Sequence, residues 1–298
     1  MKQRMIAIYI LLGVTAAMLA SATYAWYTIS QAVTIELVEV SVSSTKNLEI
    51  SSGRVSGDGK ILLPPAEAEL GDKGDESWGS VIMGLKGAVI EFPATTVTLE
   101  EGNDKTISLK TVQFNESGRT AGYVTPTLSE QWSTGSDGTD EETSIYGTYT
   151  VRGNWGIERK VAAIYPVWLR SNVDLKDLAA VVSTDNLVVT RGGADGERIY
   201  PVSDEEDPHD YEERIPHMLR VTPVAPINTE TDDVVFTKQI DLTANTAKLV
   251  YILVFFDGDP WVDEDGTHYE GLTASDVGSG LVVKGLQITF SSGALSDG

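Results

Sequence analysis

Alternation of apolar and polar residues is the dominant pattern along the chain, and it predicts β-strands. Apolar residues occupy every second position in residues 33–42, but the phase of the alternation changes once. The first phase contains Val33, Ile35 and Leu37, and the second contains Val38, Val40 and Val42. A phase switch of this kind indicates a β-bulge or a strand that changes sheet. Residues 105–114 and 282–290 also alternate. Residues 249–256 form a continuous apolar run, which is typical of a central strand covered on both faces.

Shorter strands are expected at residues 87–92, 95–99, 145–151, 161–169, 186–190 and 233–240. Only residues 173–182 after the leader carry helical spacing, because Leu175, Leu178 and Val182 recur at intervals of three and four. Repeated helical periods between the strands are absent. The pattern therefore predicts an all-β fold, a jelly-roll-like antiparallel β-sandwich with long acidic loops.

The first 25 residues have the order of a secretory leader. Lys2 and Arg4 precede an apolar stretch at residues 5–22, which predicts a hydrophobic signal helix, and the small residue Ala25 precedes Trp26. This order predicts cleavage by a signal peptidase between Ala25 and Trp26. The apolar stretch is also long enough to span a bilayer, so retention as an anchor stays open. Both alternatives place residues 26–298, taken as one domain, outside the cytoplasm, with the membrane contacted only through the precursor leader.

Charge and cysteine content exclude several functional classes. The 298 residues include 44 acidic and 22 basic side chains, for a formal net charge of −22. Such an excess of carboxylates disfavours binding to nucleic acid phosphates. The absence of cysteine excludes thiolate catalysis, disulfides and iron–sulfur clusters. The 3 histidines form no HExxH motif, and neither a GxSxG elbow nor a phosphate-binding glycine loop occurs, so no enzymatic activity is expected.

An acidic segment near residue 260 is the strongest candidate for metal binding. Its carboxylates are Asp257, Asp259, Asp263 and Asp265. The Asp-x-Asp-Gly core at 263–266 resembles part of a calcium loop, in which glycine permits a sharp turn. The register of an EF-hand fails, because Trp261 and Leu272 would occupy its first and twelfth positions. Calcium is the candidate ligand, although no cofactor is required, and a solvated acidic hairpin is the alternative.

Two segments carry a resemblance to a known family. Ala25 followed by Trp26, Tyr27 and Thr28, with a strand soon after, resembles the start of the TasA/camelysin group of secreted, pilin-like proteins of Gram-positive bacteria. Residues 251–260 and 285–292 are similar to the closing strands of clostridial proteins with the same leader. The resemblance implies a jelly-roll-like fold, export, and assembly into extracellular fibres by donation of the N-terminal strand.

The resemblance and the aromatic content lead to two functional hypotheses, one from each. In the first, the chain is a fibre or pilus subunit whose partner is a second copy of itself, and residues 26–42, free of proline and glycine, pair with the neighbour's sheet edge. The same strand could equally pair within its own subunit. In the second, the chain is an exported adhesin or glycan-binding protein that does not polymerise. Trp132 and Trp261 would then be the best candidates for stacking on sugars, with burial as the alternative.

Overall fold

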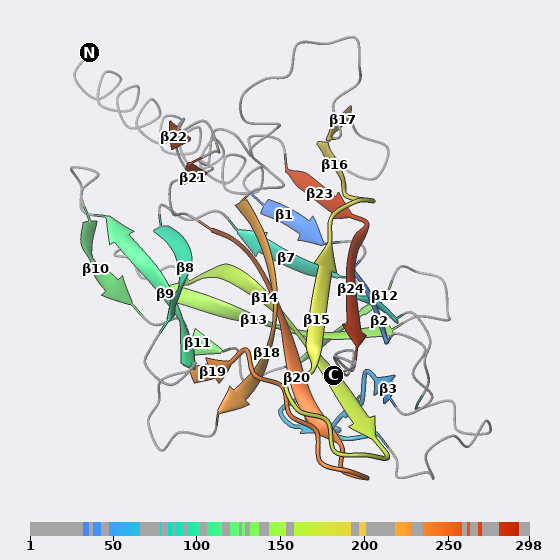
Figure 1. The fold of residues 1–298 in the computed structure, drawn as a ribbon. Coiled ribbons are helices and arrows are strands. Elements are labelled where there is room, and N and C mark those ends of the chain that lie inside the picture. The colour runs from blue at the N-terminus through green and yellow to red at the C-terminus, as the bar shows by residue number, and fades with distance from the viewer. Residues whose placement is uncertain are drawn as a thin grey trace, which may run out of the picture.

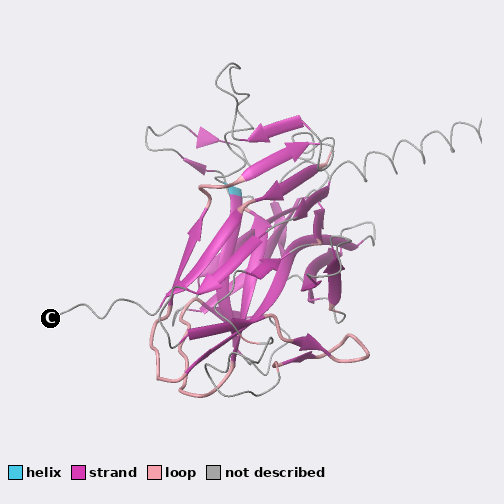
Figure 2. Ribbon diagram, turned by 90° about the vertical axis from the view of Figure 1, so that its right-hand side faces the viewer, coloured by secondary structure: helices cyan, strands magenta, loops and turns pink. Residues whose placement is uncertain are grey.

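The computed structural model describes residues 32–35, 38–42, 48–65, 78, 83–85, 87–91, 95–101, 106–114, 120–124, 127–128, 132–136, 143–152, 158–191, 197–200, 218–227, 235–257, 261–262, 268–269 and 280–291. Every element longer than one residue in this part of the chain is a β-strand, and the strands form several sheets. Figure 2 shows one very short helical piece among them. The predicted all-β class is confirmed for this part of the chain. None of its segments is a helix long and apolar enough to cross a membrane.

The largest sheet is antiparallel and has long central strands. Its main path is β10 (Thr120–Val124), β9 (Thr106–Phe114), β19 (Val235–Thr237), β18 (Leu219–Ile227), β20 (Lys248–Phe256), β14 (Glu158–Ser171), β13 (Thr143–Arg152) and β11 (Thr127–Leu128). Three further strands pair beside this path, which are β8 (Thr95–Glu101) on β9, β12 (Ser133–Ser136) on β13, and β3 (Leu48–Ser51) on β14. Figure 1 shows β14, β18 and β20 running through the centre of the molecule.

Two smaller sheets contain the first and last described strands. One has the order β17 (Glu197–Tyr200), β16 (Val188–Arg191), β23 (Leu281–Lys284), β1 (Ala32–Ile35) and β7 (Ala88–Glu91). The other has the order β15 (Ala179–Ser183), β24 (Leu286–Ser291), β2 (Val38–Val42) and β6 (Met83–Leu85). Two hairpins complete the described strands, namely β4 (Arg54–Val55) with β5 (Leu62–Leu63), and β21 (Trp261–Val262) with β22 (His268–Tyr269).

The smaller sheets are mixed, which corrects the expectation of uniformly antiparallel pairing. β1 pairs with β23 in parallel, and β2 pairs with β24 in parallel. The alternation within a strand predicts which side chains are buried, but it carries no information on the direction of the neighbour. Parallel pairing here joins segments that are about 250 residues apart, and only the complete fold brings them together.

Two apolar clusters lie on opposite faces of the large sheet. The first joins this sheet to the two smaller ones, so that Tyr165 and Ile252 of the large sheet are buried with Val40 and Ile288. The second lies on the other face and includes Leu253 and side chains from β9, β13 and β19. Because β20 contributes to both clusters, the prediction of a central strand covered on both faces is confirmed.

The predicted helix at residues 173–182 is wrong. Residues 179–183 form β15, which pairs with β24, and residues 172–178 form an irregular loop. In that loop the backbone of Leu175 exchanges hydrogen bonds with Leu242, and the Leu178 N–H donates to the carbonyl of Ile240. These backbone groups find partners on another segment, and such a tertiary contact overrides helical spacing and cannot be recognised from it.

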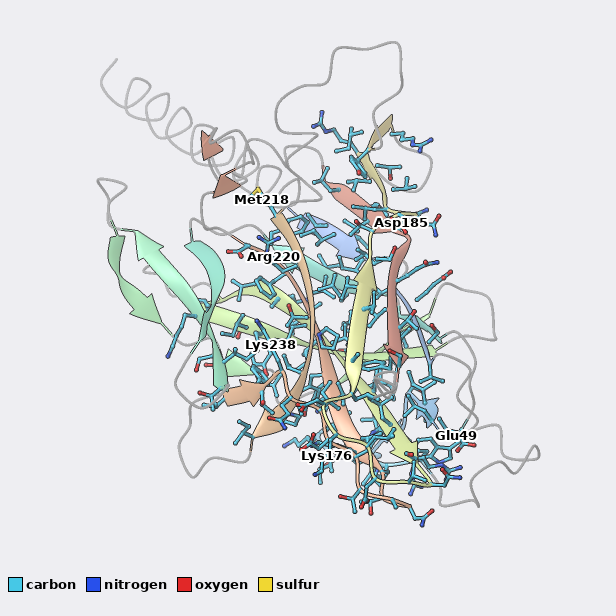
Figure 3. The ribbon with its side chains drawn as sticks, viewed as in Figure 1. Glu49, Lys176, Asp185, Met218, Arg220 and Lys238 are labelled. Carbon is cyan, nitrogen blue, oxygen red and sulfur yellow. The ribbon has the colours of Figure 1, made fainter. Side chains whose placement is uncertain are left out.

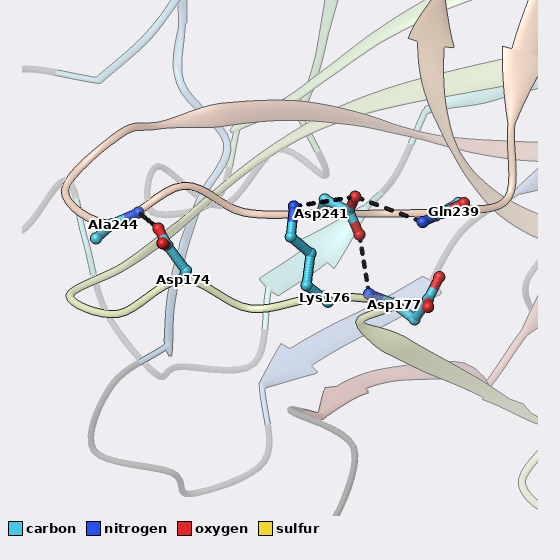
Figure 4. Close-up of polar contacts among 6 residues, drawn as sticks. All are labelled: Asp174, Lys176, Asp177, Gln239, Asp241 and Ala244. Atoms are coloured by element: carbon cyan, nitrogen blue, oxygen red, sulfur yellow. Dashed lines mark hydrogen bonds and ion pairs between the residues drawn. The ribbon is translucent and has the colours of Figure 1, made fainter.

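Carboxylates reinforce this junction between two loops (Figure 4). Asp241 accepts a hydrogen bond from the Asp177 N–H at 2.9 Å and lies 3.5 Å from the ammonium group of Lys176. Asp174 accepts from the Ala244 N–H at 2.8 Å. The hydrogen bond from the Asp177 N–H, helped by the Lys176 charge, holds the pKa of Asp241 below its ordinary value, although desolvation opposes this shift.

Candidate functional site

The segment made of β1 and β2 is the candidate functional element, and it lies inside the two smaller sheets. Each of its strands has neighbours on both edges, which are β23 and β7 for β1, and β24 and β6 for β2. The parallel register is the same in both halves, because Val33 pairs with Leu281 and Val38 with Leu286. β1 therefore lies between β7 and β23 (Figure 1), and residues 38–40 of β2 lie between β6 and β24.

The predicted phase switch within this segment is confirmed. Val33 and Ile35 are fully buried in β1, and Val38 and Val40 are fully buried in β2, so both phases face the same apolar cluster. The strand changes sheet between the two halves, as the sequence pattern indicated. Val42 is also buried, whereas Leu37 lies outside the described residues. Burial of a valine or isoleucine side chain is worth about 1.5–3 kcal/mol, so this segment contributes substantially to the core.

Two glycines with positive φ angles adjoin the strands that flank β1 and β2. Gly285 separates β23 from β24 and has a φ of +82°. A Cβ atom on this residue would lie 1.9 Å from the carbonyl oxygen of Asn186. On the other side, Gly87 has a φ of +97° and donates its N–H to the Ile35 carbonyl at 3.1 Å. Both positions use a conformation that glycine adopts without strain.

Polar side chains fix the register on the face opposite the core. The Gln287 amide donates to the Glu39 carboxylate at 2.9 Å, and the hydroxyl groups of Ser41 and Thr289 lie 3.3 Å apart. These are the register pairs of β2 with β24. A one-residue slip would direct the apolar side chains of the strand to the wrong face. Sequence reasoning missed Gln287 and Thr289 as partners, because their alternation at residues 286–291 reveals a strand but not its neighbour.

The chain after β2 is held by a buried ion pair. The Arg170 guanidinium donates to the Glu49 carboxylate at 2.7 Å, and only 8% and 16% of the two side chains are exposed. Arg170 also lies 4.2 Å from the centre of the Trp78 ring, a cation–π contact. Figure 3 places Glu49 on β3, far from Met218 and Arg220 at the opposite end of the large sheet. No sequence motif indicated this cluster.

The structure describes one carboxylate of the predicted calcium site. Asp257 follows β20 and accepts a hydrogen bond from the Arg220 guanidinium at 3.1 Å. Asp259, Asp263 and Asp265 lie outside the described residues, and the described residues contain no group of three carboxylates or histidines that could hold a metal ion. β21 and β22 pair around residues 263–267, as in the alternative of an acidic hairpin. Calcium binding stays a prediction, which calorimetry with calcium and with chelator would test.

Tryptophan positions bear on the glycan-binding alternative. Trp132 is only 8% exposed and stacks on Tyr251, with ring centroids 5.9 Å apart. The interpretation of Trp132 as an exposed sugar platform is therefore wrong, because its ring is enclosed by the second apolar cluster. Trp261 belongs to β21, but its side chain lies outside the described set.

Burial near Trp132 changes the pKa values of two tyrosines. Burial raises the pKa of Tyr251 to about 12. Burial, with a smaller contribution from Tyr251, raises the pKa of Tyr149 further, and the Tyr149 hydroxyl has no hydrogen-bond partner among the described residues. These groups stay neutral at physiological pH, so they contribute packing to the core.

The leader and the predicted processing site at Ala25 and Trp26 lie outside the described residues. The β1–β2 segment is held in its own chain by main-chain pairing on both strand edges and by apolar side chains in a shared core. Comparison of the chain with family models, with curated proteins and with solved structures finds no match.

Proposed function

We propose that the protein is a structural subunit of an extracellular fibre or pilus, built on a jelly-roll-like sandwich, that assembles head-to-tail by exchanging its N-terminal strand. The observation that carries the proposal is the position of β1 and β2, each of which pairs on both edges with strands from later in the chain. The leader predicts export, and the resemblance to the TasA/camelysin group implies fibres.

Strand exchange is physically suited to this arrangement. The strand pairs through its backbone with residues 83–91 and 281–291, and a second copy of the chain presents the same two segments. A strand that leaves its own subunit can therefore form the same hydrogen bonds in the next one. A head-to-tail contact that does not close on itself generates an open filament.

The burial of the strand predicts how exchange proceeds. Withdrawing it from a folded subunit exposes fully buried side chains such as Val33 and Val40. We expect exchange between folded monomers to be slow and to be accelerated by low urea concentrations. Deleting the strand is a poor test for the same reason, because the deletion removes part of the core along with the assembly element.

A reversible disulfide that ties β2 to its own subunit, here called a lock, tests the proposal in the full-length, exported protein. The chain has no cysteine, so a Ser41→Cys/Thr289→Cys pair introduces the sole disulfide. The two residues are register partners with hydroxyl oxygens 3.3 Å apart, and the spacing of paired strands, about 4.8 Å, lies within the Cα separation that a disulfide spans. Oxidised monomers hold their own strand, and we expect them to form no filaments by electron microscopy until a reductant is added.

A second pair supplies the matched control. Val181 pairs with Thr289 across β15 and β24, two strands that remain in one subunit during the proposed exchange. Oxidised Val181→Cys/Thr289→Cys monomers should polymerise as the unmodified protein does. When filaments are oxidised after assembly, S41C/T289C should give a ladder of covalent oligomers on a non-reducing gel. Filaments formed by locked S41C/T289C monomers would refute strand exchange.

A further inference from the structure

The chain that follows β2 is attached to its own subunit by contacts of a different kind. β3 begins at Leu48, six positions after Val42 ends β2, and it pairs with β14 over four residues. Leu48 and Ile50 are each only 2% exposed and lie in the first apolar cluster. β3 thus belongs to the large sheet, whereas β1 and β2 belong to the smaller ones.

The ion pair between Glu49 and Arg170 makes β3 difficult to detach. Both side chains are largely buried, and the Arg170 guanidinium also contacts the Trp78 ring. Separating the pair would leave a charge in a poorly solvated position without its partner. No comparable buried charge lies on the described residues of β1 and β2, where Glu39 is on the face away from the core.

Residues after β3 add further attachments. Gly53 has a φ of +71°, and a Cβ atom there would lie 2.5 Å from the Trp168 indole nitrogen, so the chain passes directly against β14. The β4–β5 hairpin then packs against the second apolar cluster. Its turn accepts a hydrogen bond at the Gly59 carbonyl from the Trp132 N–H, at 2.8 Å. Residues 48–63 are consequently integrated into both cores of one subunit.

We infer that the exchanged unit ends at Val42 and that the chain from Leu48 onward stays with the donor subunit. This inference rests on the proposed function and specifies its partner contact. Five residues separate Val42 from Leu48. A chain of that length spans at most about 20 Å. The groove that receives the strand in the neighbouring copy therefore opens within that distance of the donor's β3, and adjacent subunits are in direct contact along the fibre.

Locking β3 separately distinguishes this inference from the proposed function. In the full-length exported protein, Glu49→Cys/Arg170→Cys places two cysteines at a register pair of β3 and β14, and the disulfide replaces the ion pair. Oxidised E49C/R170C monomers should still form filaments, whereas oxidised S41C/T289C monomers should not. If E49C/R170C does not fold when reduced, Ile50→Cys/Leu169→Cys provides the adjacent pair of the same ladder.

Different results overturn the boundary at Val42 and strand exchange itself. Filaments that form only after reduction in both locked variants would show that β3 is exchanged too; that overturns the boundary at Val42 and leaves strand exchange intact. Filaments from locked S41C/T289C monomers overturn strand exchange, and the inference with it. After assembly and oxidation, E49C/R170C should migrate as a monomer on a non-reducing gel, while a ladder would place β3 in the neighbouring subunit.

Discussion

Replacing Val40 with alanine tests whether the same groove holds the strand in the monomer and in the fibre. Val40 is fully buried in β2 within the first apolar cluster. The substitution removes the equivalent of two methylene groups, each worth about 0.8 kcal/mol in transfer from water. A residual cavity adds to this loss, which gives a destabilisation of about 2–3 kcal/mol. Val181→Ala is the matched control, because Val181 is 59% exposed on β15.

Urea unfolding followed by tryptophan fluorescence measures the effect on the monomer. With an m value of about 3 kcal/mol per M, the midpoint of V40A should fall by about 1 M, and that of V181A should change little. If the groove of the next subunit receives the same strand, the urea concentration that dissociates filaments should fall by a similar amount. A V40A monomer of lower stability whose filaments dissociate at the wild-type concentration would contradict the proposed exchange.

Local geometry leads to three further predictions. Gly285→Ala should destabilise the monomer by more than about 2 kcal/mol in thermal unfolding, because the new methyl group would contact the Asn186 carbonyl at a positive φ; a wild-type melting temperature would contradict this close approach. The carboxylate of Asp241, whose pKa is lowered mainly by the Asp177 N–H, contributes stability that is present above its ordinary pKa of 3.8 and is lost as pH falls through the lowered value. In Asp241→Asn the urea midpoint should therefore decrease less as pH falls below 4 than it does in the unmodified protein. An equal decrease in both proteins would show that this carboxylate contributes nothing. Burial raises the pKa of Tyr251 to about 12, so stability should decline as pH rises above 10, where the unfolded state loses its proton first; spectrophotometric titration of Tyr251→Phe should lack one late-titrating phenol.

Strand positions were largely accessible from the sequence because alternation is a local property. The segments predicted at residues 105–114, 161–169 and 249–256 correspond to β9, β14 and β20. The phase switch in residues 33–42 was predicted from side-chain period alone, and burial of both phases confirms it. An apolar residue on a strand must face a core, so a change of phase requires a change in the strand's path.

The partners of these strands could not be read in the same way. The helix expected at residues 173–182 is instead a loop followed by β15, since Leu175 and Leu178 bond to a segment more than 60 residues away. The ion pair of Glu49 with Arg170 joins residues 121 positions apart. No local pattern encodes such pairings, because they depend on the summed contacts of the complete fold.

The sequence by itself therefore determined the β class, the burial phase of the N-terminal strand and the clustering of acidic residues between the predicted strands. Tertiary structure alone decided that this strand lies between residues 83–91 and 281–291, parallel to the latter, and that the chain is attached to the large sheet from Leu48 onward. The physical reason is the range of the interactions. Side-chain periodicity acts between neighbours in sequence, whereas sheet order and direction are set by backbone hydrogen bonds and burial between distant segments.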